Sequence, residues 1–267
     1  MKRFVLLIVM LFSLLGYVGC MNKNEISNSE VDKTTSDPSK ILTEDKSMEK
    51  SNDNKEEDRQ SETINKIDFQ DISEFIPHGW HILQKYDDDS LAIAEGDLNK
   101  DGLTDKAFVI EESIKGEGST EYAVNSPRHL LIVFANNDNT YSLSIKAEKA
   151  ILLGCEGGPY GDPFDGISIS RGSVLLNFFG GSYPRWYSSY QFRYQNNGWY
   201  LIGATEGGLV EVGEEMDNVE EDYNLLTGDY IFRELVDGKI KTRKGNRGKK
   251  QLINLQEFDP DEAKSQF

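Results

Sequence analysis

The feature that most constrains this chain is a series of short apolar segments that begins near residue 91. Each segment has the length of a β-strand rather than of a helix, and Gly, Asn and Asp residues separate one from the next. The segments are residues 91–94, 107–110, 130–134, 141–145, 150–153, 167–169, 174–178, 190–194, 199–202 and 230–232. Only residues 71–76 suggest a short helix. The pattern predicts a mainly β domain of antiparallel sheets, built as a sandwich or as a short propeller-like array.

Three of these segments also indicate local structure. Tyr190, Phe192 and Tyr194 alternate with polar residues, which predicts a strand with one buried and one solvated face. Residues 130–134 are apolar at every position, which predicts a central strand covered on both faces. The dipeptide Asn197–Gly198 is typical of a type I′ hairpin turn between two strands.

The first 20 residues have the layout of an export signal. Lys2 and Arg3 precede an apolar stretch, residues 4–15, which is too short for an ordinary spanning helix. Gly19–Cys20 at its end resembles the bacterial lipobox, and the resemblance implies cleavage of residues 1–19 and attachment of diacylglycerol to Cys20. The alternative is an ordinary secretory signal in which Cys20 is incidental. The first interpretation predicts an extracytoplasmic protein, anchored to the bacterial cell membrane by a lipid.

The composition then divides the rest of the chain into a linker and a domain. Residues 20–64 contain no aromatic residue and are rich in Ser, Asn, Lys, Asp and Glu, so they cannot bury enough surface to fold. Residues 65–267 hold nearly all the aromatic residues and form the predicted β domain. With Cys20 lipidated, Cys155 has no partner for a disulfide, and a buried free thiol is expected there. The net charge of -17 argues against a nucleic-acid partner.

Residues 97–105 carry the clearest chemical pattern, D-x-N-x-D-G-x-x-D. Oxygens at its first, third, fifth, seventh and ninth positions can converge on one cation, and a glycine at the sixth permits the turn. The candidate ligands are the side chains of Asp97, Asn99, Asp101 and Asp105 and the carbonyl of Leu103. Hard oxygen ligands without His or Cys favour Ca²⁺. The alternative is a turn rich in Asp and Asn that needs no ion.

The flanks of this loop distinguish it from an EF-hand. The twelfth position is Phe108 where an EF-hand has a bidentate Glu, and the residues on both sides are strand-like. The segment 97–110 is similar to the FG-GAP/VCBS type of repeat, and residues 130–141 resemble the strand, turn and strand that follow in it. The resemblance implies a structural Ca²⁺ ion within a β-hairpin and a bacterial surface protein of unassigned function. A single signature and the length of the domain argue against a seven-bladed propeller.

Other candidate sites carry weaker signals. Glu156, Asp162 and Asp165 lie in a Gly-rich connection and could supply the acid and base of glycoside cleavage, although a loop shaped by Gly and Pro is the simpler interpretation. Tyr183, Trp186 and Tyr187 could contact a sugar or could pack in the core. We expect residues 206–222 to form a solvated acidic loop. The basic segment 239–250 is either a charged edge hairpin or a contact to anionic groups.

Together these observations predict a membrane-anchored lipoprotein that is a non-enzymatic binding or envelope-associated module with a structural Ca²⁺ loop. The expected partners are the membrane, through the lipid on Cys20, and an envelope polymer or protein. The alternative is an envelope glycan hydrolase that uses the acidic residues of the 156–165 connection.

Overall fold

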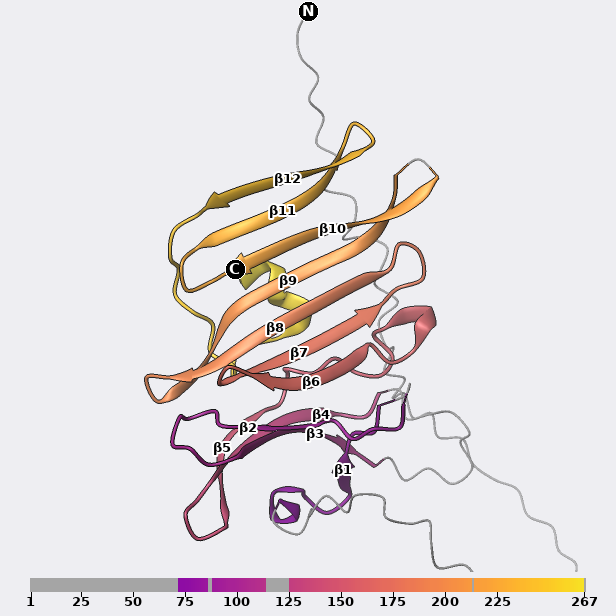
Figure 1. Cartoon of the computed structure of the whole chain (residues 1–267). Coiled ribbons are helices and arrows are strands. Elements are labelled where there is room, and N and C mark those ends of the chain that lie inside the picture. The colour runs from indigo at the N-terminus through magenta and orange to yellow at the C-terminus, as the bar shows by residue number, and fades with distance from the viewer. Residues whose placement is uncertain (1–71, 86–87, 114–124, 213, 267) are drawn as a thin grey trace, which may run out of the picture. The chain divides into compact units, whose positions relative to one another are not determined.

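The structure is a computed structural model that describes residues 72–85, 88–113, 125–212 and 214–266 (Figure 1). The predicted signal peptide and linker, with Cys20, lie outside the described residues. The described chain forms two antiparallel sheets of five and seven strands. This confirms the predicted mainly β fold. No helix in the described part of the chain is long and apolar enough to cross a membrane.

The smaller sheet has the strand order β1-β3-β4-β5, with β2 also paired to β3. Its strands are β1 (Trp80–Ile82), β2 (Ile93–Gly96), β3 (Asp105–Glu112), β4 (Arg128–Ala135) and β5 (Tyr141–Ala147). β2 pairs with the first half of β3 and β1 with its last three residues, so two short strands share one edge of β3. The 97–104 loop therefore connects two antiparallel strands, as its strand-like flanks predict.

The central strands of this sheet are buried on both faces, which confirms the prediction from the uniformly apolar segment 130–134. Leu130 and Ile132 belong to a large hydrophobic cluster shared with the second sheet. Leu131 and Val133 point to the opposite face and join a smaller cluster. That smaller cluster is closed by Ile72 and Phe75, at the 3₁₀ turn η2 (Ser73–Phe75), so the short helix expected at 71–76 is a single turn.

The larger sheet runs in sequence order from β12 to β6 (Figure 1). Its strands are β6 (Phe164–Ser170), β7 (Ser173–Gly180), β8 (Trp186–Gln195), β9 (Gly198–Val212), β10 (Glu215–Asn224), β11 (Asp229–Val236) and β12 (Lys239–Asn246). Tyr190 and Phe192 of β8 are buried and Gln191 between them is not, as the alternation predicts, whereas Tyr194 near the end of the strand is only half-buried. The basic β12 forms one edge of this sheet, which agrees with the prediction of a charged edge hairpin.

Tight turns connect the strands, with one shift from the sequence prediction. Positive φ angles occur at Asn196 (50°) and Asn197 (57°), and Gln195 pairs with Gly198. The type I′ turn is thus formed by Asn196–Asn197 rather than by Asn197–Gly198, because Asn also tolerates the left-handed region. The β6–β7 turn uses Arg171 (51°) and Gly172 (68°), the dipeptide that the sequence marks as a turn.

The two sheets meet along a close contact between β2 and β6. A Cβ atom at Gly96 would lie 2.6 Å from Cγ2 of Ile169, so only glycine permits this approach. Gly172, in the β6–β7 turn, lies beside the 97–104 loop, where an added Cβ would come 3.5 Å from the carbonyl oxygen of Asp97. The candidate ion loop is therefore located where one sheet packs on the other. This two-sheet packing favours the sandwich over the propeller-like array.

Two predicted segments have a different structure. Residues 150–153 are not a strand but a buried connection. Their apolar side chains pack in the core although their backbone makes no β pairing. The segment 206–222 is not an acidic loop, because most of it lies in the paired strands β9 and β10. Tyrosine hydroxyls donate hydrogen bonds to its glutamates, so the acidic strands are held by partners that are distant in the sequence.

The C-terminal segment completes the main core. It returns along β9, where the amide of Leu201 donates to the carbonyl of Ile253, and then enters η4 (Pro260–Glu262) and α1 (Ala263–Gln266). Phe258 is fully buried and contacts the rings of Tyr190 and Phe192 at centroid distances of 4.9 and 5.0 Å. This segment therefore covers the core face of β8.

We predict that Phe258→Ala lowers the free energy of unfolding by about 3–5 kcal/mol, because it opens a cavity between two aromatic rings. The measurement is urea unfolding of the purified protein followed by circular dichroism. The exposed neighbour Glu257 provides the control, and Glu257→Ala should change stability by less than about 0.5 kcal/mol. Equal effects of the two substitutions would contradict this role of the C-terminal segment.

Candidate functional site

The loop between β2 and β3 is ordered by its own side-chain oxygens. Asp97 Oδ1 accepts from the amide of Lys100 (2.7 Å), and Oδ2 accepts from the amide of Gly102 (3.1 Å). Asn99 Oδ1 accepts from the amide of Asp101 at 3.0 Å. Asp101 Oδ1 accepts from the amide of Leu103 at 2.8 Å. Asn99 and Asp101 each bind the amide two residues on and form successive Asx turns, and Asp97 binds amides further along the loop. The backbone therefore curls around the side chains of these alternate residues.

Asp105 makes a different set of contacts and is fully buried. Its Oδ2 accepts from the amides of Leu98 (2.8 Å) and Asn99 (3.3 Å). Its Oδ1 accepts from the amide of Ala135 at the end of β4 (2.9 Å). Burial raises the pKa of Asp105, and the three amide donors act in the opposite direction. Asp105 thus links the start of the loop, the start of β3 and the end of β4.

The donor set of the loop fits a hard cation. Each carboxylate oxygen of Asp97 and Asp101 accepts one hydrogen bond and keeps a further lone pair, and so does the amide oxygen of Asn99. Asp105 fits less well, since Oδ2 already has two donors. Within the described ranges no three His, Cys, Asp or Glu side chains gather into a metal-binding group. The ligands that the loop offers to a cation are therefore two carboxylates, the amide oxygen of Asn99 and the carbonyl oxygen of Leu103.

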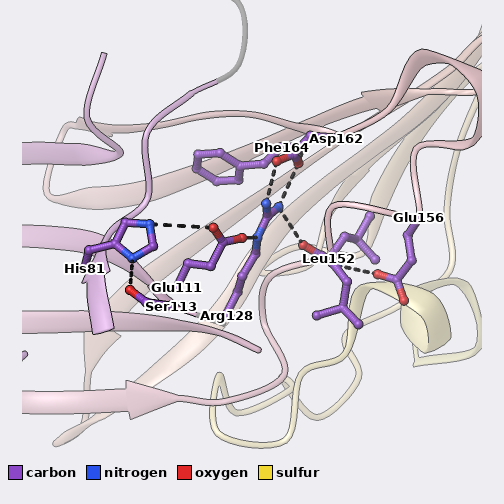
Figure 2. Close-up of polar contacts among 9 residues, drawn as sticks. His81, Glu111, Ser113, Arg128, Leu152, Glu156, Asp162 and Phe164 are labelled. Carbon is purple, nitrogen blue, oxygen red and sulfur yellow. Dashed lines mark hydrogen bonds and ion pairs between the residues drawn. The ribbon is translucent and has the colours of Figure 1, made fainter. Parts of the chain in front are cut away.

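A second polar cluster surrounds Arg128 at the start of β4 (Figure 2). Its guanidinium donates to Glu111 on β3, to both carboxylate oxygens of Asp162 and to the carbonyl of Leu152. Burial opposes the charge of Arg128, but Asp162 and Glu111 outweigh it and raise its pKa. The side chain is only 3% exposed, so removal of either acidic partner would leave a buried charge uncompensated. The cluster holds the connection between β5 and β6 against the smaller sheet.

The three acidic residues proposed for catalysis have separate environments. Asp162 is paired with Arg128 and also accepts from the amide of Phe164. Glu156 accepts from the amide of Leu153 at 2.6 Å (Figure 2), and burial raises its pKa, with Asp261 and Asp259 adding to the effect. Asp165 is exposed on β6. The carboxylates of Asp162 and Glu156 thus make structural contacts within the fold.

Figure 2 also shows a contact that sequence reasoning missed. His81 Nδ1 lies 3.0 Å from Ser113 Oγ, and Nε2 lies 3.7 Å from Glu111 Oε2. The order Ser–His–Glu resembles a hydrolase triad, but 3.7 Å is too long for a hydrogen bond. The other oxygen of Glu111 is bound to Arg128, which reduces its ability to stabilise a charged imidazole. Because Ser113 and His81 are 32 positions apart in the sequence, no local pattern could have revealed this contact.

The three aromatic residues proposed as a ligand platform do not form one surface. Trp186 and Tyr187 are consecutive in β8 and therefore point to opposite faces of the sheet. Trp186 packs over Gly180 toward the core, and Tyr187 covers Gly207 and donates to Glu220 at 2.7 Å. Tyr183 is 61% exposed in the preceding turn. A ligand contact at these residues stays a prediction.

Cys155 differs from the sequence prediction. It is half-buried and disulfide-bonded in the structure, not a buried free thiol. The other cysteine of the sequence is Cys20, which lies outside the described residues. A sulfur that carries a lipid through a thioether cannot also form a disulfide. Lipidation of Cys20 and a disulfide at Cys155 within one chain therefore exclude each other.

Comparison with known proteins adds no relative. No protein-family model, no curated protein and no solved structure matches this chain.

We predict that Asp105→Asn lowers the free energy of unfolding by about 1–3 kcal/mol, because an amide NH₂ would face a backbone N–H donor in a buried site. The measurement is urea unfolding in the presence of chelator, so that bound cations do not contribute. Asp101→Asn is the matched control, since Asp101 is exposed and Asn keeps the acceptor for Leu103. A similar loss of stability in both variants would show that Asp105 has no special structural role.

Proposed function

We propose that this chain is a membrane-anchored extracytoplasmic lipoprotein whose β domain is a non-enzymatic binding module with a structural Ca²⁺ loop. The observation that carries the proposal is the loop 97–103, in which the side-chain oxygens of Asp97, Asn99 and Asp101 bind backbone amides, located where the two sheets meet. Asp97, Asn99 and Asp101 would hold the ion with the carbonyl of Leu103, and Asp105 would orient the loop from behind. A bound Ca²⁺ would neutralise the carboxylates and stabilise the contact between the sheets.

The contacts of the acidic residues favour a module over a glycan hydrolase. A glycosidase needs two carboxyl groups that face the same bond, one of them free to give up a proton. Here Asp162 neutralises a buried arginine and Glu156 closes a turn of its own connection. These two structural contacts account for Asp162 and Glu156 without a catalytic role.

The proposed membrane anchor needs the sulfur of Cys20 for the lipid, so it requires that Cys155 has no disulfide to Cys20 in the mature chain. The proposal rests on the signal-like segment and the Gly19–Cys20 pair. Positively charged residues, an apolar stretch of limited length and a small residue before the cysteine occur together there. The linker would then place the domain away from the lipid surface, where a flexible chain allows it to reach a partner in the envelope.

We predict that millimolar CaCl₂ raises the melting temperature of the purified protein above its value in chelator. At a concentration of 100 times the Kd, binding to the folded state adds about 2.7 kcal/mol, which corresponds to a shift of roughly 5–10 °C for a domain of this size. Differential scanning calorimetry measures the shift, and MgCl₂ at equal concentration tests the preference for Ca²⁺.

Two variants make the calcium experiment specific. Asp101→Ala removes one proposed ligand and should abolish the shift. Asp138→Ala removes a carboxylate that forms a similar exposed Asx turn, with Thr140, and should preserve the shift. A shift that survives Asp101→Ala, or no shift in the unmodified protein, would refute the calcium loop.

We predict that Cys20→Ser moves the protein expressed in bacteria from the membrane fraction to the soluble or unprocessed fraction. The physical reason is that membrane retention depends on the acyl chains, which need the sulfur of Cys20. Fractionation measures the location, and mass spectrometry of the N-terminal peptide measures the lipid. A mature chain with Cys20 disulfide-bonded to Cys155 would instead contradict the lipid anchor.

A further inference from the structure

A cleft of about 470 Å³ opens between the two sheets. Three segments form its walls: the β4–β5 hairpin, the β8–β9 hairpin and the C-terminal segment. Its lining includes Leu143, Ser144, Tyr194, Asn197, Trp199 and Gln256. The volume is in the range of small-molecule sites, which is about 300–1,000 Å³.

Three aromatic residues, Phe134, Tyr194 and Trp199, form the floor of this cleft and are held in place by contacts within the fold. The rings of Tyr194 and Phe134 meet edge to face at 5.0 Å, and the rings of Tyr194 and Trp199 lie 5.6 Å apart. Trp199 is 2% exposed, and its indole Nε1 donates to Ser144 Oγ at 2.9 Å. Trp199 itself is covered, and it holds the half-buried ring of Tyr194 in place. A side chain that is already ordered lowers the entropic cost of binding.

A β-bulge turns Ser144 toward this floor. Ile132 pairs with Ile145 and Val133 pairs with Leu143, so Ser144 is the extra residue of β5. Bulges commonly redirect a side chain at a functional site. Here the bulge brings a hydroxyl onto Trp199 and leaves the neighbouring Leu143 50% exposed at the cleft. A half-exposed leucine beside ordered aromatic rings offers an apolar contact to a ligand.

The polar groups of the cleft are neutral. None of its ten lining residues is Asp, Glu, Lys, Arg or His, although 28% of the chain is charged. The polar side chains are the amides of Asn197, Asn254 and Gln256, the hydroxyl of Ser144 and the phenol of Tyr194. Amides both donate and accept hydrogen bonds, which suits a ligand with many hydroxyl groups and no charge.

From this lining we propose that the cleft binds a neutral saccharide unit. The half-buried ring of Tyr194 and the half-exposed Leu143 would pack on the apolar C–H face of a sugar ring, and the amides would bind its hydroxyl or acetamido groups. A charged sugar would find no counter-ion here and would lose hydration without compensation. The inference rests on the proposed function, since it names the ligand class of the binding module.

Saturation-transfer NMR on the full purified protein tests the site with three probes. Tri-N-acetylchitotriose and maltotriose are the neutral probes, and trigalacturonate is the charged probe. We expect transfer to a neutral trisaccharide and none to trigalacturonate. The indole N–H signal of Trp199 should shift during the same titration, because its hydrogen-bond partner lines the cleft.

Asn197→Gly should weaken binding roughly five- to tenfold, because it removes an amide but keeps a residue that tolerates positive φ. Leu143→Ala should weaken it roughly two- to fivefold by removing apolar contact. The matched controls lie outside the cleft lining: Asn139→Gly at another positive-φ turn residue and Leu235→Ala at another half-exposed leucine. Both controls should bind like the unmodified protein.

The outcomes separate the site from the proposed function. No transfer to either neutral trisaccharide, stronger transfer to trigalacturonate, or equal effects of cleft and control variants would overturn the saccharide site. Cleavage of a trisaccharide, detected by mass spectrometry of the same samples, would instead overturn the non-enzymatic function. Binding that is lost in both cleft variants and kept in both controls would support the site.

Discussion

The buried carboxylate of Asp105 is the interaction on which the arrangement of the smaller sheet depends. A charge that is removed from water is costly unless hydrogen bonds replace the lost hydration. Asp105 receives three of them from backbone amides in two separate segments, the loop after β2 and the end of β4. The carboxylate therefore fixes where β3 begins relative to β4. The loop that Asp105 orders lies beside the turn that contains Gly172.

A second constraint comes from the acidity of the larger sheet. Glu206 on β9 and Glu221 on β10 are direct cross-strand partners, and two like charges at that distance repel each other. Each accepts a hydrogen bond from a different tyrosine, Glu206 from Tyr190 and Glu221 from Tyr223. Burial raises the pKa of both tyrosines, and the adjacent carboxylates add to the effect, so both hydroxyls remain donors. Phenol groups thus let an acidic sequence form paired strands.

These two interactions explain how far the sequence predicts the fold. Apolar periodicity identifies strands such as β4 and β8, because burial there depends on the residues of the strand itself. It fails for β10, whose acidic residues accept hydrogen bonds from side chains of other strands, such as Tyr187 and Thr205. It also fails for residues 150–153, which are buried without β pairing. The ion loop can be predicted from the sequence because the residues that supply its oxygens are close together in the chain. The cleft cannot be predicted in this way, because its walls come from segments more than 100 residues apart. The contact of Gln256 with the Lys146 carbonyl illustrates this separation.

Asp105 also connects the candidate ion loop with the proposed saccharide cleft. Its Oδ1 holds the amide of Ala135, and the preceding residue, Phe134, forms part of the aromatic floor. Because the fold's own amides satisfy Asp105, the position of Phe134 depends on the folded loop rather than directly on a cation. An ion held by Asp97, Asn99 and Asp101 could act on the cleft only if the loop had a second, less ordered state that the ion disfavoured. Calcium would then stabilise the cleft to the extent that it stabilises the loop, which is the behaviour of a structural ion and not of a switch.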